Sequence, residues 1–298
     1  MGKDLIGRYV WIVDTLQRYR RLTKSELNDL WMRSRFSDGN PLPDRTFYHY
    51  RRGIEDNFHI EVKCNAAGEY YIDNTSGSRN ARNIANMLID SYAVTDALRD
   101  SFAASAHIEV EDVPSAREFL PSVLEAIESK HKIRFTYAGF NRSRAEHDIV
   151  FHPYHLKRYK QRWYMLGWKE KSNGIRTYAL DRVREMVIET EQFEIPEDFS
   201  PEEHFGNIIG VTSSHAEERV VRLRTTPVQA KYFRALPLHT SQSEEIHDDY
   251  SIFTYKLKLN YELVSELTAL GDQVKVLDPP ELAVMVKTRL RDALQQYF

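Results

Sequence analysis

The segment Arg162-Trp163-Tyr164-Met165-Leu166-Gly167-Trp168 decides the fold of the middle of the chain, because it is a dense apolar run of strand length. Short segments on both sides of it also alternate apolar with polar side chains or form short apolar runs. They are residues 133–137 and 149–156 before it and residues 176–180 after it. Short segments of this kind are typical of β-strands. Four or five such strands within about 60 residues predict a small barrel or sandwich.

Basic residues are concentrated in the same part of the chain. Residues 131–184 contain 13 Lys and Arg against 4 Asp and Glu, a net charge of +9, whereas the whole chain has a formal net charge of −3. Residues 185–298 contain 11 Lys and Arg against 20 Asp and Glu, a net charge of −9. A basic segment beside an acidic one favours binding of an anion, and nucleic acid is one candidate. The alternative is a solvated surface that binds nothing.

Length and composition exclude several classes of protein. With 298 residues, 42% of them hydrophobic and 29% charged, the chain is predicted to form two or three globular domains. No apolar run approaches the roughly 20 residues of a membrane span, and the first residues lack the apolar segment of a signal peptide. Cys64 is the only cysteine, which excludes intramolecular disulfides and cysteine-based zinc sites. We therefore expect a cytoplasmic protein.

Three helices are predicted near the N-terminus. Apolar residues at helical spacing predict the first over residues 4–20. Thr23 and Glu26 have the spacing of a capping box, which predicts that a second helix begins there and runs to about Met32. The third is predicted over residues 43–57, after a segment rich in turn-forming residues.

A β-hairpin is predicted directly after the third helix. Apolar and polar side chains alternate over residues 60–64, a turn follows at 65–68, and residues 70–72 return as a second strand. Three short helices and a hairpin are the winged variant of the helix-turn-helix. Residues 1–75 are therefore predicted to form a winged helix-turn-helix DNA-binding domain.

The third predicted helix has two different faces. Apolar residues at steps of three or four predict its buried stripe: Phe47, Tyr50, Ile54 and Phe58. The opposite face carries the side chains that we expect to contact the phosphates and base edges of double-stranded DNA: Arg45, Thr46, Tyr48, His49 and Arg52. The alternative is that this domain binds only proteins, because function does not follow from fold alone.

Residues 76–117 are predicted to form a helical linker. Apolar residues at helical spacing indicate a helix that could pair with its copy in a second subunit or, equally, pack onto its own chain. These residues are Ile84, Met87, Leu88, Ser91, Tyr92, Val94 and Leu98. A short helix near 115–129 is predicted to lead into the strands.

Three motifs in the strand-rich segment resemble those of the WYL domain. They are residues 152–156 (His-Pro-Tyr-His-Leu), residues 162–167 (Arg-Trp-Tyr-Met-Leu-Gly) and residues 176–183 (Arg-Thr-Tyr-Ala-Leu-Asp-Arg-Val), in that order. Met165 replaces the leucine of the Trp-Tyr-Leu triplet, an exchange that nearly conserves volume. The resemblance assigns residues 118–195 to a WYL domain and implies an Sm-type, SH3-like β-barrel.

The resemblance also implies a sensor function. WYL domains of transcriptional regulators bind a nucleotide or a single-stranded nucleic-acid effector through basic and aromatic side chains. Arginine holds phosphate with two parallel hydrogen bonds, and aromatic rings stack on bases. The effector-binding positions implied here are Tyr137, Tyr154, His155, Arg162, Tyr164, Arg176 and Arg182. Trp163 is expected in the core, and Asp181 could form a structural ion pair with Arg182.

The C-terminal third, residues 196–298, shows a different pattern. Strands are predicted near 219–225, 238–246, 251–259 and 274–277, with helices at 227–236, 262–270 and 280–297. The β-α-β-β-α-β order is ferredoxin-like, with one added helix. The segment resembles the WCX-type extension that follows many WYL domains, often as a dimerisation or regulatory piece. The whole chain is thus expected to be an α+β multidomain protein.

These observations favour a ligand-responsive transcriptional regulator, expected to be a homodimer that binds a pseudo-palindromic operator. A nucleic-acid-processing enzyme is an alternative, but the phosphate-binding, metalloprotease and nucleophile-elbow motifs are absent from the sequence. We therefore expect no catalysis and no cofactor. His152 and His155 are predicted on opposite faces of a strand, so no metal site is expected. A scaffold protein that binds no DNA is the third alternative.

Overall fold

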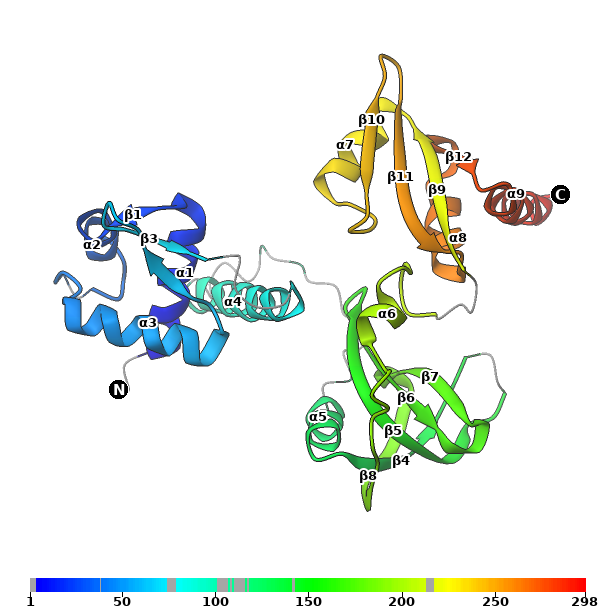
Figure 1. Cartoon of the computed structure of the whole chain (residues 1–298), viewed down its shortest axis with the longest axis horizontal. Coiled ribbons are helices and arrows are strands. Elements are labelled where there is room, and N and C mark those ends of the chain that lie inside the picture. Colours follow the sequence, from blue (N-terminus) through cyan, green and yellow to red (C-terminus); the bar gives the residue numbers. More distant parts are fainter. Residues whose placement is uncertain are drawn as a thin grey trace. The chain divides into compact units, whose positions relative to one another are not determined.

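The computed structural model describes residues 4–37, 39–73, 79–100, 107, 109, 116, 118–140, 143–212 and 217–298. The chain forms two compact units, Met1–Glu111 and Asp112–Phe298, which are described separately. The predicted boundary loop at 74–78 and most of the linker beyond residue 100 lie outside the described residues. Figure 1 shows the elements of both units.

The first unit contains the three predicted helices and the hairpin. Its elements are α1 (Leu5–Tyr19), β1 (Leu22–Thr23), α2 (Lys24–Met32), α3 (Asp44–Phe58), β2 (Val62–Cys64), β3 (Glu69–Ile72) and α4 (Arg79–Asp100). The hairpin pairs antiparallel, and β1 adds a short third strand, so that the sheet has the order β1-β3-β2. The helix positions predicted from the sequence are confirmed within one or two residues.

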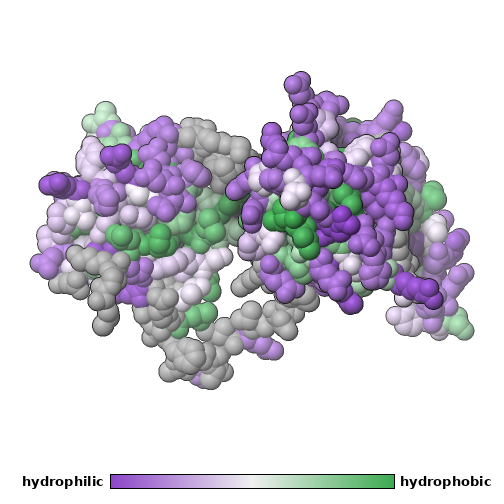
Figure 2. Space-filling view, turned by 90° about the horizontal axis from the view of Figure 1, so that it is seen from below, coloured by the Kyte–Doolittle hydropathy of each residue, from purple (hydrophilic) through white to green (hydrophobic). Residues whose placement is uncertain are grey.

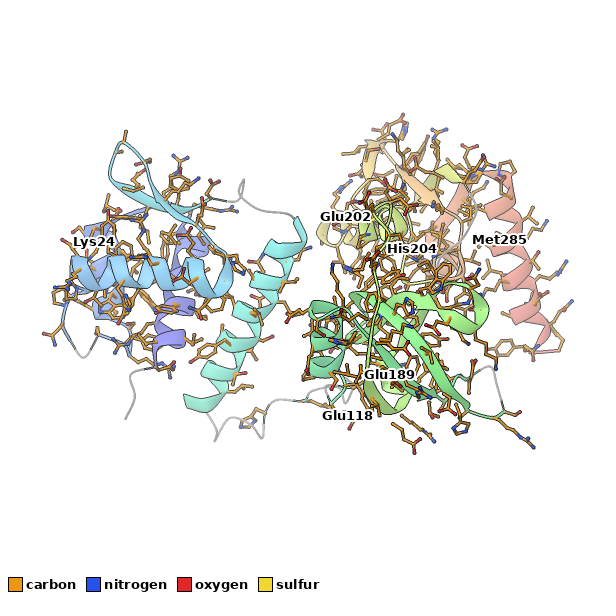
Figure 3. The ribbon with its side chains drawn as sticks, turned by 60° about the horizontal axis from the view of Figure 1, so that its bottom comes forward. Lys24, Glu118, Glu189, Glu202, His204 and Met285 are labelled. Atoms are coloured by element: carbon orange, nitrogen blue, oxygen red, sulfur yellow. The ribbon has the colours of Figure 1, made fainter. Side chains whose placement is uncertain are left out.

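Local sequence explains how the helices of this unit begin. Thr23 accepts a hydrogen bond from the Glu26 backbone N–H while the Glu26 carboxylate accepts from the Thr23 N–H, so the predicted capping box is confirmed. Lys24, labelled in Figure 3, donates to the Leu42 carbonyl oxygen at 2.6 Å. This bond fixes the segment before α3 against α2. The predicted stripe of α3 is buried, with Phe47 and Ile54 no more than 1% exposed.

The helix α4 packs with one face onto its own unit. Ala85 and Ile89 are buried in the core formed by α1, α2 and α3. The Tyr92 hydroxyl donates to both carboxylate oxygens of Asp4, at 2.6 and 2.8 Å. Packing onto the same chain, one of the two predicted possibilities, is therefore observed. Side chains on other faces of α4 remain exposed: Ile84, Leu88 and Val94.

The second unit begins with the predicted strand-rich segment. Its elements are α5 (Leu120–Glu128), β4 (His131–Tyr137), β5 (Glu146–Tyr159), β6 (Arg162–Lys169), β7 (Gly174–Ala179), the 3-10 turn η3 (Leu180–Arg182) and β8 (Val183–Gln192). The five strands pair in the order β7-β6-β5-β4-β8. Their core contains Phe135, Phe151 and Met165, each no more than 1% exposed.

The predicted barrel is not closed. Within the described residues, no backbone pairing joins the two edge strands, β7 and β8. The edge strand β7 is instead linked to β4 by a side chain, because the Tyr137 hydroxyl at the end of β4 accepts a hydrogen bond from the Ala179 N–H at the end of β7. The Ala138 N–H also donates to the Arg182 carbonyl oxygen at 3.0 Å. The sheet is therefore curved and open in the described residues, and the Sm-type, SH3-like barrel implied by the resemblance is not confirmed.

The second half of this unit has the predicted β-α-β-β-α-β order. It contains β9 (Glu218–Thr225), α7 (Pro227–Ala235), β10 (Ser243–Ile246), β11 (Ser251–Lys258), α8 (Tyr261–Ala269), β12 (Val274–Asp278) and α9 (Pro280–Gln295), with sheet order β10-β11-β9-β12. A short helix, α6 (Pro201–Phe205), precedes it. The β10 strand begins five residues later than predicted, because the Gln242 side chain holds residues 238–242 in a turn by accepting from the Leu238 N–H.

The surface is mainly hydrophilic on the face drawn in Figure 2, with apolar areas between the polar ones. Among the helices that the structure describes, none combines the length and apolar character needed to cross a bilayer.

Candidate effector cavity and nucleic-acid face

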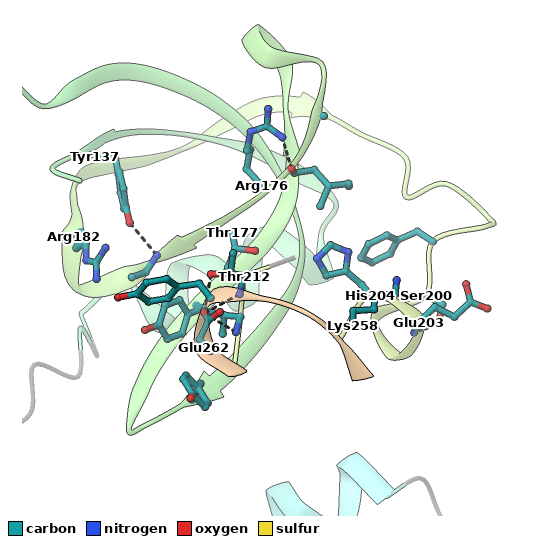
Figure 4. A pocket seen from close by; sticks show the side chains of 18 of the residues that line it. Tyr137, Arg176, Thr177, Arg182, Ser200, Glu203, His204, Thr212, Lys258 and Glu262 are labelled. Atoms are coloured by element: carbon teal, nitrogen blue, oxygen red, sulfur yellow. Dashed lines mark hydrogen bonds between the residues drawn. The ribbon is translucent and has the colours of Figure 1, made fainter. Parts of the chain in front are cut away.

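A cavity of about 1360 Å³ opens in the second unit. Strands β4, β5, β6 and β7 and the turn η3 contribute residues to it, and so do α6 and the beginning of α8. Figure 4 shows Tyr137 and Arg182 on one side of this cavity and Ser200, Glu203 and His204 on the other. The cavity is thus lined jointly by the strand-rich half and the C-terminal half of the unit.

Three cationic side chains of the cavity form no ion pair with the residues that the structure describes: Arg176, Arg182 and Lys258. The Arg176 guanidinium donates to the Ile175 carbonyl oxygen at 2.7 Å. The Arg182 guanidinium lies over the Phe140 ring, 3.9 Å from its centroid, and its Nε is buried with no hydrogen-bond partner among the described residues. A guanidinium that is not neutralised by a carboxylate remains available to an anionic ligand.

Aromatic rings accompany these cations. Tyr164 lines the cavity from β6, and burial raises the pKa of its hydroxyl although Arg182 and Arg162 lower it. Tyr159 lines it from β5, donates to Glu266 at 3.1 Å and has a pKa raised mainly by burial. Phe140 is 73% exposed. An exposed ring beside a guanidinium offers a stacking surface next to a phosphate-binding group.

The cavity is not uniformly basic. Asp198, Glu203 and Glu262 also line it. The Glu262 carboxylate is engaged by the backbone, because its Oε1 accepts from the N–H groups of Val211 and Thr212 at 3.3 and 3.0 Å. A ligand that combines anionic groups with hydrogen-bond donors suits this lining better than a simple polyanion does.

The α3 face opposite the buried stripe is exposed, as the sequence predicts. Arg45, Tyr48, His49 and Arg52 are exposed, and Thr46 is half-buried. Arg51 has a different role, since its Nε and Nη2 both donate to the Val62 carbonyl oxygen and its guanidinium lies near the rings of Tyr48 and Tyr70. Arg51 therefore fixes the hairpin to α3.

No group of three or more His, Cys, Asp or Glu side chains suited to a metal ion occurs in the part of the chain that the structure describes. The His152 ring stacks on Phe193 and hydrogen-bonds to Glu170 at 3.0 Å. This histidine thus has a packing role in the sheet.

Comparison with known proteins identifies the two halves of the second unit. Residues 118–188 match the family model of the WYL domain, and residues 217–294 match that of the WCX domain. The chain carries a WYL domain and a WCX domain. Both matches lie within the segments assigned from the sequence, and the recognition of these two domains is confirmed. No curated protein matches the chain.

Solved structures give more distant similarities. The proteasome accessory factor B/C (PafBC) of Arthrobacter aurescens is 21% identical, with a TM-score of 0.35, over 83% of this chain and 40% of that one. A CRISPR Cas-related protein is 12% identical, with a TM-score of 0.40, over 86% of this chain and 74% of that one. The chain thus spans less than half the length of the PafBC chain.

The structure brings four of the seven implied effector residues together. Tyr137, Tyr164, Arg176 and Arg182 line the cavity of the WYL domain. The other three lie elsewhere: Tyr154 is buried against Phe193 and Phe199, His155 is half-buried beside Phe205, and Arg162 is paired with Asp181 at 3.2 Å. Burial lowers the pKa of His155. Asp181 therefore pairs with Arg162 and not with the adjacent Arg182, which turns toward Phe140.

Several lining residues were missed from the sequence. Phe140 follows a predicted strand and belongs to none of the WYL motifs, whereas Lys258, Tyr261 and Glu262 belong to the WCX domain. The local sequence indicates only where Tyr261 and Glu262 lie in the fold, because Asn260 caps α8 and they form the first turn of that helix.

The WYL and WCX domains are joined through residues 207–212. On the WYL side, the Lys157 ammonium donates to the Gly210 carbonyl oxygen at 2.6 Å and lies 4.3 Å from the centroid of Phe205. On the WCX side, the Asn260 amide donates to the carbonyl oxygens of Ile209 and Thr212. This segment is therefore hydrogen-bonded to both domains at once.

Lys157 is expected to make the stability of the second unit depend on pH. Burial lowers its pKa to about 8, although Glu262 raises it. The unfolded chain keeps this proton up to about pH 10.5, so the folded state gains stability relative to the unfolded state as pH rises from 8 toward 10. We expect a gain of about 1 kcal/mol between pH 7.5 and 9.5, after allowance for solvent screening.

Urea unfolding at the two pH values tests this expectation. Lys157→Met should lose the gain, whereas Lys160→Met should keep it, because Lys160 is exposed and paired with Glu266. An equal pH response of the wild type and Lys157→Met would show that the lysine is not desolvated.

Proposed function

We propose that this protein is a DNA-binding transcriptional regulator in which residues 1–75 form a winged helix-turn-helix domain. The order of three helices and an antiparallel hairpin in the first unit supports this assignment. The observation that carries the proposal is that α3 is amphipathic. Its apolar stripe is buried, whereas the opposite face exposes Arg45, His49 and Arg52, side chains that can contact phosphates and base edges.

The cavity of the WYL domain is proposed to bind the effector, a nucleotide or a single-stranded nucleic acid. Two observations support this proposal: the guanidinium groups of Arg176 and Arg182 form no ion pair within the described part of the chain, and exposed or half-buried rings lie beside them. An effector changes DNA affinity only if it binds two conformations of the protein unequally. We further propose that the chain acts in the cytoplasm by binding and not by catalysis, as a homodimer on a pseudo-palindromic operator.

Removing two side chains of the α3 face is expected to weaken DNA binding. The double variant Arg45→Ala/His49→Ala should lose at least about tenfold in affinity for a duplex that the wild-type chain selects from fragmented genomic DNA, because one bidentate contact to a base edge is worth roughly 1–3 kcal/mol. The salt dependence should also become weaker, so that the slope of log affinity against log salt concentration is less steep than in the wild type.

The matched control is Arg18→Ala. It removes an exposed arginine from α1 that is paired with Asp14 at 3.2 Å, and it should leave affinity and salt dependence unchanged. Equal affinity of the double variant and the wild type would remove α3 as the DNA-contacting helix. If the wild-type chain selects no duplex from fragmented genomic DNA, the result would instead favour a protein-binding role.

A further inference from the structure

The four-stranded sheet of the WCX domain has one covered face and one open face. Its inward side chains form a core with residues of all three helices, among them Ala230 of α7, Leu263 of α8 and Leu282 of α9. Along the central strands β9 and β11, buried residues alternate with exposed or half-buried ones. Directly paired residues of neighbouring strands share a face, so the open face extends from these two strands onto β12 and β10.

Positively charged side chains are concentrated on this open face. Arg222 and Arg224 lie on β9, Lys256 on β11 and Lys275 on β12, although residues 185–298 together have a net charge of −9. Lys275 is the direct partner of Arg224 in the register of β12 and β9. Like charges directly opposite each other destabilise a sheet. The repulsion between these two cations would be relieved by an anion that binds between them.

Three of these cations are not neutralised by the protein. Among all the residues that the structure describes, no carboxylate forms an ion pair with Arg224, Lys256 or Lys275, and each of the three is exposed. The Arg224 guanidinium lies 4.3 Å from the ring centroid of Tyr250, and this ring is stacked with that of His247, with 4.4 Å between the centroids. The Arg224 side chain is therefore positioned by a ring, which leaves its charge available to a ligand.

The carboxylates of the open face lie at its margins. Asp278 of β12 approaches Arg222 at 3.5 Å, and both side chains are at least 40% exposed. Glu218 is the first residue of β9, and Glu245 of the edge strand β10 contacts His247 at 3.1 Å. The middle of the face is therefore positively charged.

The remaining side chains of the face distinguish between classes of anionic partner. The outward positions of β9 and β11 carry no aromatic ring, so they offer no surface on which the bases of a single strand could stack. Val220 and Ile252 are apolar, but they lie directly opposite Lys256 and Arg224, respectively. They therefore form no contiguous apolar core of the kind that a protein interface contains. The phosphate backbone of a duplex needs neither feature and is contacted mainly by Lys and Arg.

We propose that the open face of the WCX sheet binds the phosphate backbone of duplex DNA through Arg224, Lys256 and Lys275. Phosphate contacts carry no sequence information, so this face adds affinity while the α3 face selects the sequence. The inference rests on the proposed function as a DNA-binding protein and adds a second surface that contacts the duplex. It does not involve the cavity or its ligand.

The test compares two duplexes by fluorescence anisotropy, one selected by the wild-type chain and one of the same length and composition in shuffled order. Arg224→Gln/Lys275→Gln should bind both duplexes at least about tenfold more weakly at about 50 mM salt. The slope of log affinity against log salt concentration should become less steep by about 2, one for each lost phosphate contact. The ratio of the two affinities should stay unchanged, because both duplexes present the same backbone.

Lys231→Gln/Lys287→Gln is the matched control. It removes the same two positive charges from exposed positions of α7 and α9, helices that pack on the covered face of the same sheet. This variant should keep the affinity and the salt dependence of the wild type. Arg45→Ala/His49→Ala should instead lower the ratio of the two affinities. Thermal unfolding verifies that every variant is folded.

The outcomes separate this inference from the proposed function. Equal salt dependence of Arg224→Gln/Lys275→Gln and of the control would overturn the sheet contact and leave the assignment of α3 intact. A weaker salt dependence of the sheet variant, with no effect of Arg45→Ala/His49→Ala, would support the sheet contact and contradict the role of α3. A change of oligomeric state in sedimentation, with unchanged duplex binding, would assign the face to a second copy of the chain and overturn the inference. Absence of duplex binding by the wild type would overturn both proposals.

Discussion

Gly167→Ala is expected to destabilise the second unit by about 2–4 kcal/mol. Gly167 pairs with Pro153 beside an irregularity of β5. A methyl group there would overlap the His152 carbonyl oxygen and would lie 2.8 Å from Cζ of the buried Phe151 ring. Neither the backbone carbonyl nor the core ring can move away without separating β5 from β6. A glycine inside a strand commonly marks such a close backbone approach.

Urea unfolding followed by tryptophan fluorescence measures this effect. Gly174→Ala is the matched control in the same sheet, because its methyl would meet the flexible end of the Arg176 side chain at 3.3 Å and would be in ordinary van der Waals contact with the Ser172 carbonyl oxygen at 3.8 Å. The control should change stability by less than about 0.5 kcal/mol. If Gly167→Ala unfolds at the same urea concentration as the wild type, the close approach of β5 and β6 is not as described.

Arg182→Ala is expected to cause the largest loss of effector binding. An arginine that donates charge-assisted hydrogen bonds contributes roughly 1.5–3 kcal/mol, so affinity for a mixed-base oligonucleotide should fall by about 10- to 100-fold. Arg182→Lys keeps the charge but loses the planar fork and the stacking on Phe140, and it should recover only part of the affinity.

Calorimetry in the Arg45→Ala/His49→Ala background measures this loss. Arg158→Ala is the control, because Arg158 is an exposed arginine of β5 that does not line the cavity. Equal affinities of Arg182→Ala and Arg158→Ala would contradict the proposed site.

The oligonucleotide should be recovered intact after incubation with the wild-type chain and Mg²⁺. Cleavage by the wild type that is lost in Asp181→Ala would instead indicate catalysis.

Local features of the fold were predictable because short-range physics determines them. The capping box at Thr23 and Glu26 and the apolar spacing of α3 depend on residues within a turn or two of each other. Closure of the β-sheet depends on contacts between strands that are distant in the sequence, such as the hydrogen bond from the Ala179 N–H of β7 to the Tyr137 hydroxyl of β4. No local pattern reports such a contact.

The candidate site was only partly predictable for the same reason. Asp181 and Arg182 are adjacent in sequence, which suggested an ion pair, but they lie in a 3-10 turn that directs the first to Arg162 and the second to Phe140. Lys258 and Tyr261 follow the WYL strands by more than 60 residues, and only the packing of the two domains brings them to the cavity.

The carboxylate of Asp4 links α1 to α4 in the first unit. It caps α1 by accepting from the Gly7 N–H at 2.9 Å, and it also accepts from Tyr92 of α4. One turn further along α1, the Arg8 guanidinium donates to the Tyr50 hydroxyl of α3 at 2.8 Å. Polar contacts thus run from α4 through the first turn of α1 to α3. A displacement of α4 along its own axis would break the bond between Tyr92 and Asp4, the residue that caps α1, so the position of α4 is coupled to the same first turn of α1 that holds α3.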